Sequence, residues 1–214
     1  MKIVAGTISE WMFFDLGSTL IDETSCLEYR LRETLEGQPA PVHDGFLKEL
    51  RWGYFMNQDG YQLALQKFGL KKAPWRGAYE QLYPQTPQVL RSLGQKYHLG
   101  VIANQAAGAR ERLAAWGISG YFDIIVLSCE LGISKPDPSI FQSALEQAGC
   151  TPERAWMIGD RLDNDILPAM ELRMKTVWLK QGWGALGNPD LLPNKPIYTI
   201  NNVGQLLEIF EKTD

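Results

Sequence analysis

Short apolar runs alternate with amphipathic stretches along the second half of the chain, and this alternation constrains the fold most. Five runs have the length of a buried strand, and they lie at residues 99–103, 124–127, 155–158, 176–179 and 196–200. Between them, apolar residues recur at three-to-four spacing, which predicts helices at residues 110–116, 139–148, 165–172 and 203–212. Strands separated by helices of this length are typical of βαβ units. The sequence therefore predicts an α/β fold built on a parallel sheet.

The first third of the chain follows a different pattern. A further buried strand is expected at residues 11–14, and apolar residues then recur at helical spacing through residues 24–83 without a β-rich run. We therefore predict a Rossmann-like parallel-sheet core flanked by helices, formed by residues 1–21 and 84–214. Residues 22–83 are expected to form a small all-helical cap domain inserted into it. Residues 2–8 are a candidate for an additional edge strand.

Composition excludes several classes of protein. The net charge is −4 and no Lys/Arg cluster is present, so a nucleic-acid partner is not expected. No apolar run approaches the roughly 18 residues of a membrane span, and the first ten residues do not read as a secretory signal. Three scattered cysteines and two histidines provide neither a disulfide framework nor a multi-histidine metal site. The expectation is a cytoplasmic globular protein without a membrane or nucleic-acid partner.

Asp15 is the first candidate for chemistry. It follows the predicted strand at 11–14 and precedes a turn rich in small residues, Gly17, Ser18 and Thr19. In open α/β sheets, ligands bind at the carboxyl ends of the strands. There a carboxylate can serve as a nucleophile or a metal ligand, although a solvated aspartate at the end of a strand is the plainer alternative.

A second acidic group follows the predicted strand at 155–158. Asp160, Asp163 and Asp165 place three carboxylates within six positions, which is costly unless a cation neutralises them. Mg²⁺ prefers such oxygen ligands and commonly uses one or two carboxylates together with substrate phosphate. An acidic helix N-terminus is the alternative. It accounts well for Asp163 and poorly for Asp160, which directly follows the buried run.

Lys135 lies in a turn between a predicted strand and a predicted helix. Pro136 and Pro138 restrict the backbone on its carboxyl side. A lysine fixed in such a turn can act as a point charge towards phosphate or carboxylates. Considered alone, it also fits an ordinary surface lysine.

Taken together, these pieces resemble the signature of the haloacid dehalogenase-like (HAD) superfamily. The resemblance runs through four motifs, at residues 14–20, 99–105, 135–136 and 159–165, and the helical segment matches the position of that family's cap. It implies a Mg²⁺-dependent hydrolase acting on a small phosphorylated substrate. Asp15 would be the catalytic nucleophile, and Lys135 would steady Asp15 and the phosphoryl oxygens.

The resemblance also implies where metal and phosphate bind. The expected Mg²⁺ ligands are Asp15, the backbone carbonyl of Gly17, Asp160 and Asp165. The expected phosphate-binding residues include Lys135 and the end of the second motif. At that motif Ala103 offers its backbone N–H, and the side chain of Asn104 is a further candidate.

Two positions depart from the family pattern. The first motif usually has a second aspartate, which protonates the leaving oxygen and then activates water, but Gly17 stands there in this chain. Such a group is typically worth about 10²–10⁴ in rate. Ala103 replaces the usual Ser or Thr of the second motif. Asp22 and Glu23 follow the first motif and are candidates for a substitute acid, or are simply carboxylates at the start of a helix.

Three functions are therefore considered. The leading one is a phosphatase that works through an aspartyl-phosphate, with activity weakened or narrowed by Gly17 and Ala103. The alternative is a catalytically quiet protein of this fold that binds a phospho-ligand or a protein partner. A metal-independent 2-haloacid dehalogenase also lacks the second aspartate, but Asp160 argues against it. Substrate identity and oligomeric state are not predicted.

Overall fold

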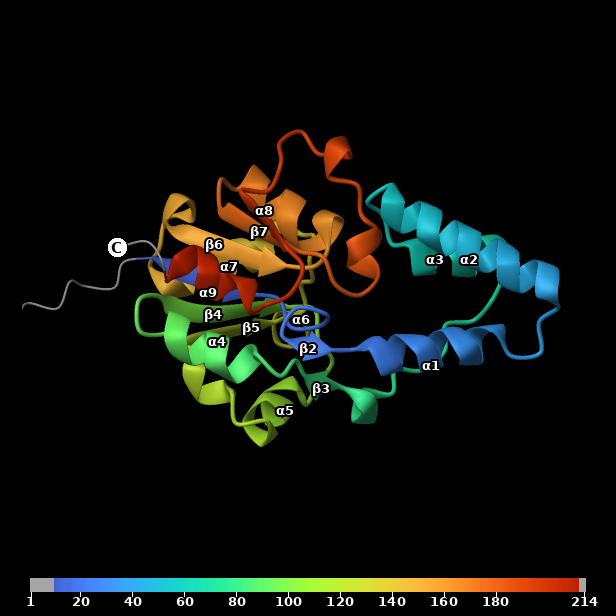
Figure 1. The fold of residues 1–214 in the computed structure, drawn as a ribbon, viewed down its shortest axis with the longest axis horizontal. Coiled ribbons are helices and arrows are strands. Elements are labelled where there is room, and N and C mark those ends of the chain that lie inside the picture. Colours follow the sequence, from blue (N-terminus) through green and yellow to red (C-terminus); the bar gives the residue numbers. More distant parts are fainter. Residues whose placement is uncertain (1–9, 212–214) are drawn as a thin grey trace, which may run out of the picture.

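A six-stranded parallel sheet forms the centre of the molecule in the computed structural model, which describes residues 10–211 (Figure 1). The strand order is β5-β4-β1-β6-β7-β8. The strands are β1 (Trp11–Phe14), β4 (His98–Ala103), β5 (Ile124–Leu127), β6 (Ala155–Gly159), β7 (Lys175–Leu179) and β8 (Tyr198–Ile200). All neighbouring strands pair in parallel. The predicted Rossmann-like α/β fold is confirmed.

Helices cover both faces of this sheet. Helices α4 (Thr86–Leu93), α5 (Ala109–Ala115) and α9 (Gln205–Phe210) pack on the face that receives Met12 and Phe14. Helices α7 (Pro138–Ala148) and α8 (Leu167–Glu171) pack on the opposite face, and α6 (Ser128–Leu131) is a single turn. Because the sheet is covered on both sides, every residue of β1 is buried. This explains why the strands appear in the sequence as continuous apolar runs.

The observed elements differ from the predicted ones mainly at their ends. The helix expected at 165–172 is preceded and partly replaced by a π-helical turn, Leu162–Ile166, before α8 begins. The edge strand considered at residues 2–8 lies outside the described residues. Short 3₁₀ turns occupy Gly77–Tyr79, Ser119–Tyr121, Pro152–Arg154, Trp183–Leu186 and Pro189–Leu191.

Three helices inserted after β1 form a helical unit, residues 24–68, that extends away from the sheet (Figure 1). They are α1 (Thr24–Leu35), α2 (Ala40–Phe55) and α3 (Gly60–Phe68), and they enclose an apolar cluster of their own. Glycine is required where α2 and α3 cross, since a Cβ atom on Gly60 would lie 2.0 Å from the carbonyl oxygen of Leu50. The division into a core of residues 1–21 and 84–214 and a cap of residues 22–83 stays a prediction.

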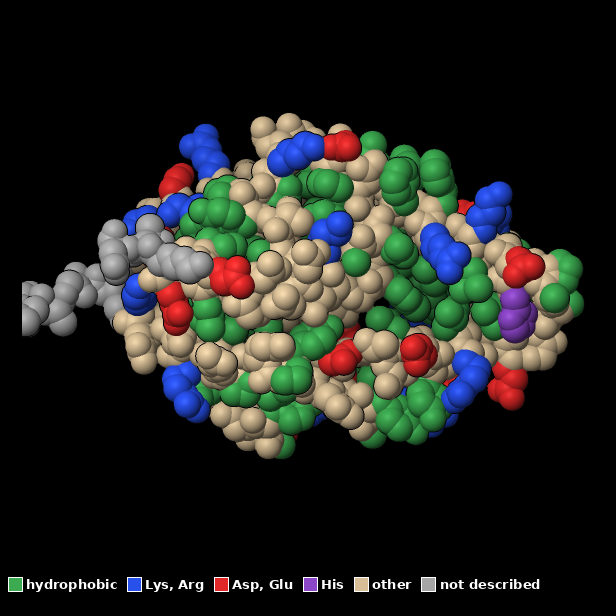
Figure 2. Space-filling model, viewed as in Figure 1, with side chains coloured by type: hydrophobic (Ala, Val, Ile, Leu, Met, Phe, Trp, Pro, Cys, Tyr) green, Lys and Arg blue, Asp and Glu red, His purple; other side chains and the backbone are tan. Residues whose placement is uncertain are grey.

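A two-stranded antiparallel ladder, not expected from the sequence, joins the helical unit to the core. It consists of β2 (Ile21–Asp22) and β3 (Gln81–Leu82), so the chain enters and leaves the unit through adjacent strands. A second attachment joins the loop after β7 to α3, where the Trp183 ring packs against the Tyr61 ring at a centroid distance of 5.4 Å. The surface is hollowed between the core and the helical unit, and acidic side chains lie beside this hollow (Figure 2). Both attachments place α1 and α2 near the carboxyl ends of the strands.

Among residues 10–211, none of the helices combines the length and the apolar character that crossing a bilayer would require.

Candidate active site

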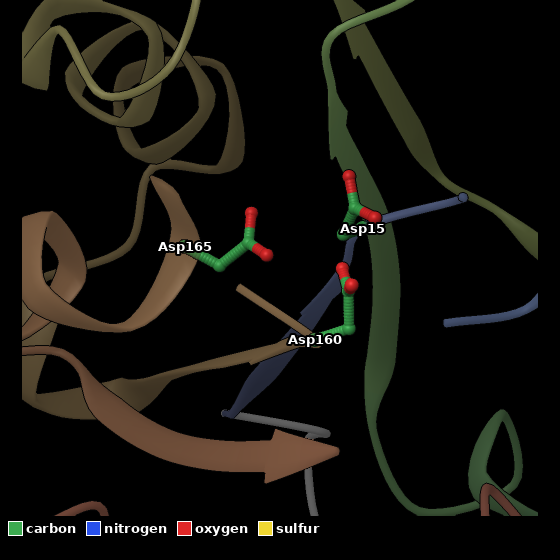
Figure 3. Close-up of side chains that lie close together, drawn as sticks. All are labelled: Asp15, Asp160 and Asp165. Atoms are coloured by element: carbon green, nitrogen blue, oxygen red, sulfur yellow. The ribbon is translucent and has the colours of Figure 1, made fainter. Parts of the chain in front are cut away.

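Three aspartates converge at the carboxyl edge of the sheet (Figure 3). Asp15 directly follows β1 and Asp160 directly follows β6, the neighbouring strand, so their parallel alignment brings them together. The N–H of Asp15 donates to the carbonyl of Ile158 at 2.9 Å and extends this pairing. Asp165 comes from the π-helical turn after β6, where its Oδ2 accepts the N–H of Arg161 at 3.0 Å. Carboxylate oxygens of the three lie within 4.8 Å of one another.

Lys135 lies at the centre of this acidic group. Its buried ammonium donates to Oδ1 of Asp15 at 2.5 Å and to Oδ1 of Asp165 at 2.6 Å. A third hydrogen bond, of 2.9 Å, goes to the carbonyl of Ile102 in β4. All three donor positions of the ammonium are therefore used, and the side chain is fixed between the end of β4 and two carboxylates.

Asn104 holds the backbone of Lys135 in place. Its side-chain amide donates to the Lys135 carbonyl at 2.9 Å, and its Oδ1 accepts the Lys135 N–H at 2.8 Å. These two bonds connect the loop after β4 to the loop before α7 and fix the position of the Lys135 backbone relative to the end of β4. Both the nitrogen and the oxygen of the Asn104 side-chain amide are thus bonded to Lys135. The expected role of Asn104 in phosphate binding stays a prediction.

Asn104→Ala is expected to lower the free energy of unfolding by about 1–3 kcal/mol, because it leaves the N–H and carbonyl of Lys135 without their partners. Urea unfolding followed by circular dichroism measures this change. Gln142→Ala, which removes an exposed amide on α7, is the matched control and is expected to stay within about 0.5 kcal/mol of wild type. Equal stability of the two variants would contradict the structural role of Asn104.

Burial and mutual repulsion shape the protonation of this site. Burial raises the pKa of Asp160 well above its usual value, and the charges of Asp165 and Asp15 raise it further. Burial also raises the pKa of Asp165 to about 6, although Lys135 opposes the shift. Burial disfavours the charged form of Lys135, yet the Asp15 and Asp165 carboxylates outweigh this effect and raise its pKa. When ionised, three carboxylates thus face one ammonium at the centre of the site.

A divalent cation suits this surplus of negative charge. The three buried carboxylates supply only oxygen donors, the type that Mg²⁺ prefers. Asp160 is fixed by its surroundings, since the Trp178 indole donates to its backbone carbonyl at 2.7 Å. A Cβ atom on Gly184 would lie 2.6 Å from the Asp160 Oδ2 atom, so the loop after β7 closes over this carboxylate. The roles of Asp15, the Gly17 carbonyl, Asp160 and Asp165 as metal ligands stay predictions.

The loop after β7 was missed by reasoning from the sequence. Its signal was present, because Gly182-Trp183-Gly184 follows an apolar run at the same edge of the sheet as Asp15 and Asp160. Gly182 has a φ of 53°, which glycine adopts at little cost. A Cβ atom there would also lie 2.4 Å from the Ser18 hydroxyl.

The turn after Asp15 brings a fourth carboxylate to the site. The Glu23 carboxyl lies beside Gly17, and the Ser18 hydroxyl is 3.5 Å from its Oε2 atom. Burial raises the pKa of Glu23 to about 8, with further contributions from the charges of Asp15 and Glu80. Ala103 ends β4 and is fully buried. It brings no hydroxyl to the site, and its expected backbone contact with phosphate stays a prediction.

The sequence and fold match known proteins over most of the chain. Residues 12–179 match the family model of haloacid dehalogenase-like hydrolases. A glyceraldehyde 3-phosphate phosphatase of Pyrococcus furiosus is 30% identical, over 94% of this chain and 92% of its own. A phosphoglycolate phosphatase of Aquifex aeolicus is 28% identical, over 86% of this chain and 92% of its own.

Among solved structures, a HAD phosphatase from Thermococcus onnurineus superposes with a TM-score of 0.62 at 23% identity. The superposition covers 94% of this chain and 97% of that one, and it shows that the two chains share a fold. The family match extends from β1 to the end of β7 and so includes all four of the predicted motifs. The chain is therefore a member of the haloacid dehalogenase-like hydrolase family.

Proposed function

We propose that this protein is a Mg²⁺-dependent phosphatase that hydrolyses a small phosphorylated metabolite through an aspartyl-phosphate intermediate. The observation that carries the proposal is the contact of Lys135 with Asp15 and Asp165, beside the third carboxylate of Asp160. A nucleophile, a fixed cation and a set of oxygen donors thereby meet at one end of the sheet. Phosphoryl transfer depends mainly on such positioning and on neutralisation of charge.

Asp15 is the nucleophile in this proposal. Lys135 holds its Oδ1 atom at 2.5 Å, which orients the carboxylate and leaves Oδ2 to attack phosphorus. The phosphoryl group moves to Asp15 as the bond to the leaving oxygen breaks, and water then cleaves the resulting acyl phosphate. Bound Mg²⁺ supplies charge neutralisation for the phosphoryl oxygens. Asp160 and Asp165, with Asp15 and the Gly17 carbonyl, are the groups that would hold it.

The proposed substrate class is a small phosphate ester. Its support is the activity for which two relatives that span most of this chain are named, a glyceraldehyde 3-phosphate phosphatase and a phosphoglycolate phosphatase. The two substrates in these names differ in their carbon skeletons, and each carries a phosphate on a short carbon chain. In this proposal the substrate enters through the hollow between the core and the helical unit (Figure 2). Closure of a lid over a site commonly excludes water.

Two observations keep a second function in view. Gly17 brings no side-chain carboxylate and Ala103 brings no hydroxyl, which favours a catalytically quiet protein that binds a phospho-ligand. A metal-independent 2-haloacid dehalogenase is disfavoured, because its chemistry uses no Mg²⁺ and would not need the acidic pair Asp160 and Asp165 as metal ligands. Chloride release from a 2-haloacid without metal would support that activity instead.

The test of the proposed function is hydrolysis of p-nitrophenyl phosphate and acetyl phosphate, with Mg²⁺ and with EDTA. Turnover is expected with Mg²⁺ and is expected to fall to background with EDTA, because the proposed reaction relies on the metal to offset the surplus carboxylate charge. Added Mg²⁺ should restore it. Undiminished turnover in EDTA would contradict the metal requirement. Mg²⁺ binding without turnover of either phosphate would favour the quiet alternative.

A further inference from the structure

We propose that Glu23 serves as the acid/base residue of this phosphatase and replaces the carboxylate that Gly17 lacks. The inference rests on the proposed function, since it assigns a role within that reaction. Its basis is the position of the Glu23 carboxyl group, which lies where a side chain at position 17 would begin. The carboxylate thus reaches the site from the first residues after β2 instead of from the turn after β1.

The geometry at Gly17 carries the argument. A Cβ atom built on Gly17 would lie 2.5 Å from Oε1, 2.6 Å from Oε2 and 2.7 Å from Cδ of Glu23. These contacts are closer than real Cβ atoms make, so a side chain at 17 would displace the carboxyl of Glu23 from its present position. The Gly17 backbone is not among the left-handed residues of the described chain, so its φ angle does not require glycine. Glycine at 17 therefore leaves open the space that the Glu23 carboxyl occupies.

The start of α1 explains why the Glu23 side chain is available. A carboxylate at a helix start usually accepts a backbone N–H of the first turn. Asp22 does this here, since its Oδ1 accepts the N–H of Thr24 at 2.9 Å. Glu23 makes no side-chain capping bond, and its carboxyl is turned towards Gly17 and the Ser18 hydroxyl. Ser18 has a φ of 55°, a conformation uncommon for serine.

The proposed role balances in two steps. As Asp15 attacks phosphorus, the bond from phosphorus to the leaving oxygen breaks, and the proton of the Glu23 carboxyl passes to that oxygen. Water then attacks the aspartyl-phosphate, gives a proton to the Glu23 carboxylate, and releases Asp15 as a carboxylate. The products are an alcohol and inorganic phosphate, and Glu23 ends protonated as it began.

The first measurement compares Glu23→Gln with wild type on two kinds of leaving group. With glycerol 1-phosphate, whose alkoxide needs a proton, kcat is expected to fall by about 10²–10⁴-fold. With p-nitrophenyl phosphate, whose leaving group needs none, the first step should proceed and hydrolysis of the intermediate should become slow. We expect a burst of p-nitrophenolate equal to the enzyme concentration, together with a phosphorylated protein visible by mass spectrometry. A role of Glu23 in folding alone would produce neither the burst nor the trapped intermediate.

The second measurement removes the carboxylate of Glu23 and supplies one from position 17 instead. Glu23→Ala should lose turnover of glycerol 1-phosphate as Glu23→Gln does, and adding Gly17→Asp should restore most of it, because the space is then free. Adding Gly17→Ala to Glu23→Ala fills the same space without a carboxylate and should restore nothing. Gly17→Asp in the wild-type background should impair the enzyme, since two carboxyl groups would meet at the contact distances given above.

Asp22→Asn is the matched control. It neutralises the adjacent carboxylate, whose oxygen is engaged with Thr24, and is expected to leave turnover of both phosphates unchanged. If Glu23→Gln matched wild type with both substrates while activity still required Asp15, the assignment of Glu23 would be wrong and the proposed function would stand. If wild type turned over neither substrate, or if Asp15→Asn remained active, the proposed function would fail and this inference with it.

Discussion

Asp15→Asn is expected to lower the turnover of p-nitrophenyl phosphate and acetyl phosphate by about 10⁴-fold or more, the size of effect seen when a hydrolase loses its covalent nucleophile. An amide cannot form the acyl phosphate, and no other carboxylate shares the position of Asp15 at the end of β1. The change is nearly isosteric, and the amide oxygen can still accept from Lys135 in place of Oδ1. The measurement is steady-state kinetics with Mg²⁺, alongside circular dichroism to show that the fold is retained.

Asp163→Asn is the matched control for this experiment. Asp163 lies in the same turn as Asp165, but it pairs with Arg161 at 2.5 Å and is not among the three clustered aspartates. Its turnover is expected to stay close to that of wild type. If Asp15→Asn were as active as wild type, the aspartyl-phosphate mechanism would be wrong, regardless of the activity of Asp163→Asn.

The parallel sheet could be predicted because burial of a strand on both faces leaves a continuous apolar run. β1, β5 and β6 were each anticipated to within a residue for this reason. The convergence of Asp15 and Asp160 followed from the same reasoning, since adjacent parallel strands end at the same edge. Lys135 depended on the family resemblance, because the neighbouring prolines restrict its backbone but do not distinguish it from an exposed lysine.

Other features required the folded chain. The β2–β3 ladder has two residues in each strand, which is too short to produce a periodic pattern. The bonds from the Asn104 amide to the Lys135 backbone, 31 residues away, could not be foreseen from the sequence, which offered Asn104 only as a candidate for phosphate binding. The placement of the Glu23 carboxyl depends on the turn at Ser18 and on the N-terminus of α1. No spacing rule connects positions 17 and 23, so the sequence alone left Glu23 undistinguished from Asp22.

A single ammonium holds the acidic group together, and this has a consequence for stability. Lys135→Met is expected to lower the free energy of unfolding of the metal-free protein by about 3–5 kcal/mol at neutral pH. The methionine replaces most of the volume of the side chain but leaves Asp15 and Asp165 buried without their cation. Thermal or urea unfolding in EDTA measures the change. Turnover is expected to be lost as well, because Asp15 is no longer oriented.

The pH dependence of this loss follows from the carboxyl groups. Burial and the charge of Asp15 raise the folded-state pKa of Asp165 to about 6 even beside Lys135, above the unfolded value of about 4. Removing the lysine takes away the charge that opposes this shift. The folded variant then binds more protons than the unfolded chain, so its stability falls as the pH rises through this window. The difference between variant and wild type should therefore be smallest near pH 4 and largest at neutral pH. In wild type, the raised pKa of Lys135 keeps its contribution in place across this range.

Two further variants separate this effect from ordinary loss of packing. Lys67→Met removes an exposed lysine that pairs with Glu49 and is expected to change stability by less than about 1 kcal/mol. Adding Asp15→Asn to Lys135→Met should recover part of the loss, because it removes one of the unpaired charges. A loss that stayed constant between pH 4 and pH 7, with no recovery in the double variant, would mean that Lys135 stabilises the fold through packing. The ammonium would then not be the group that makes a three-carboxylate site compatible with folding in the absence of metal.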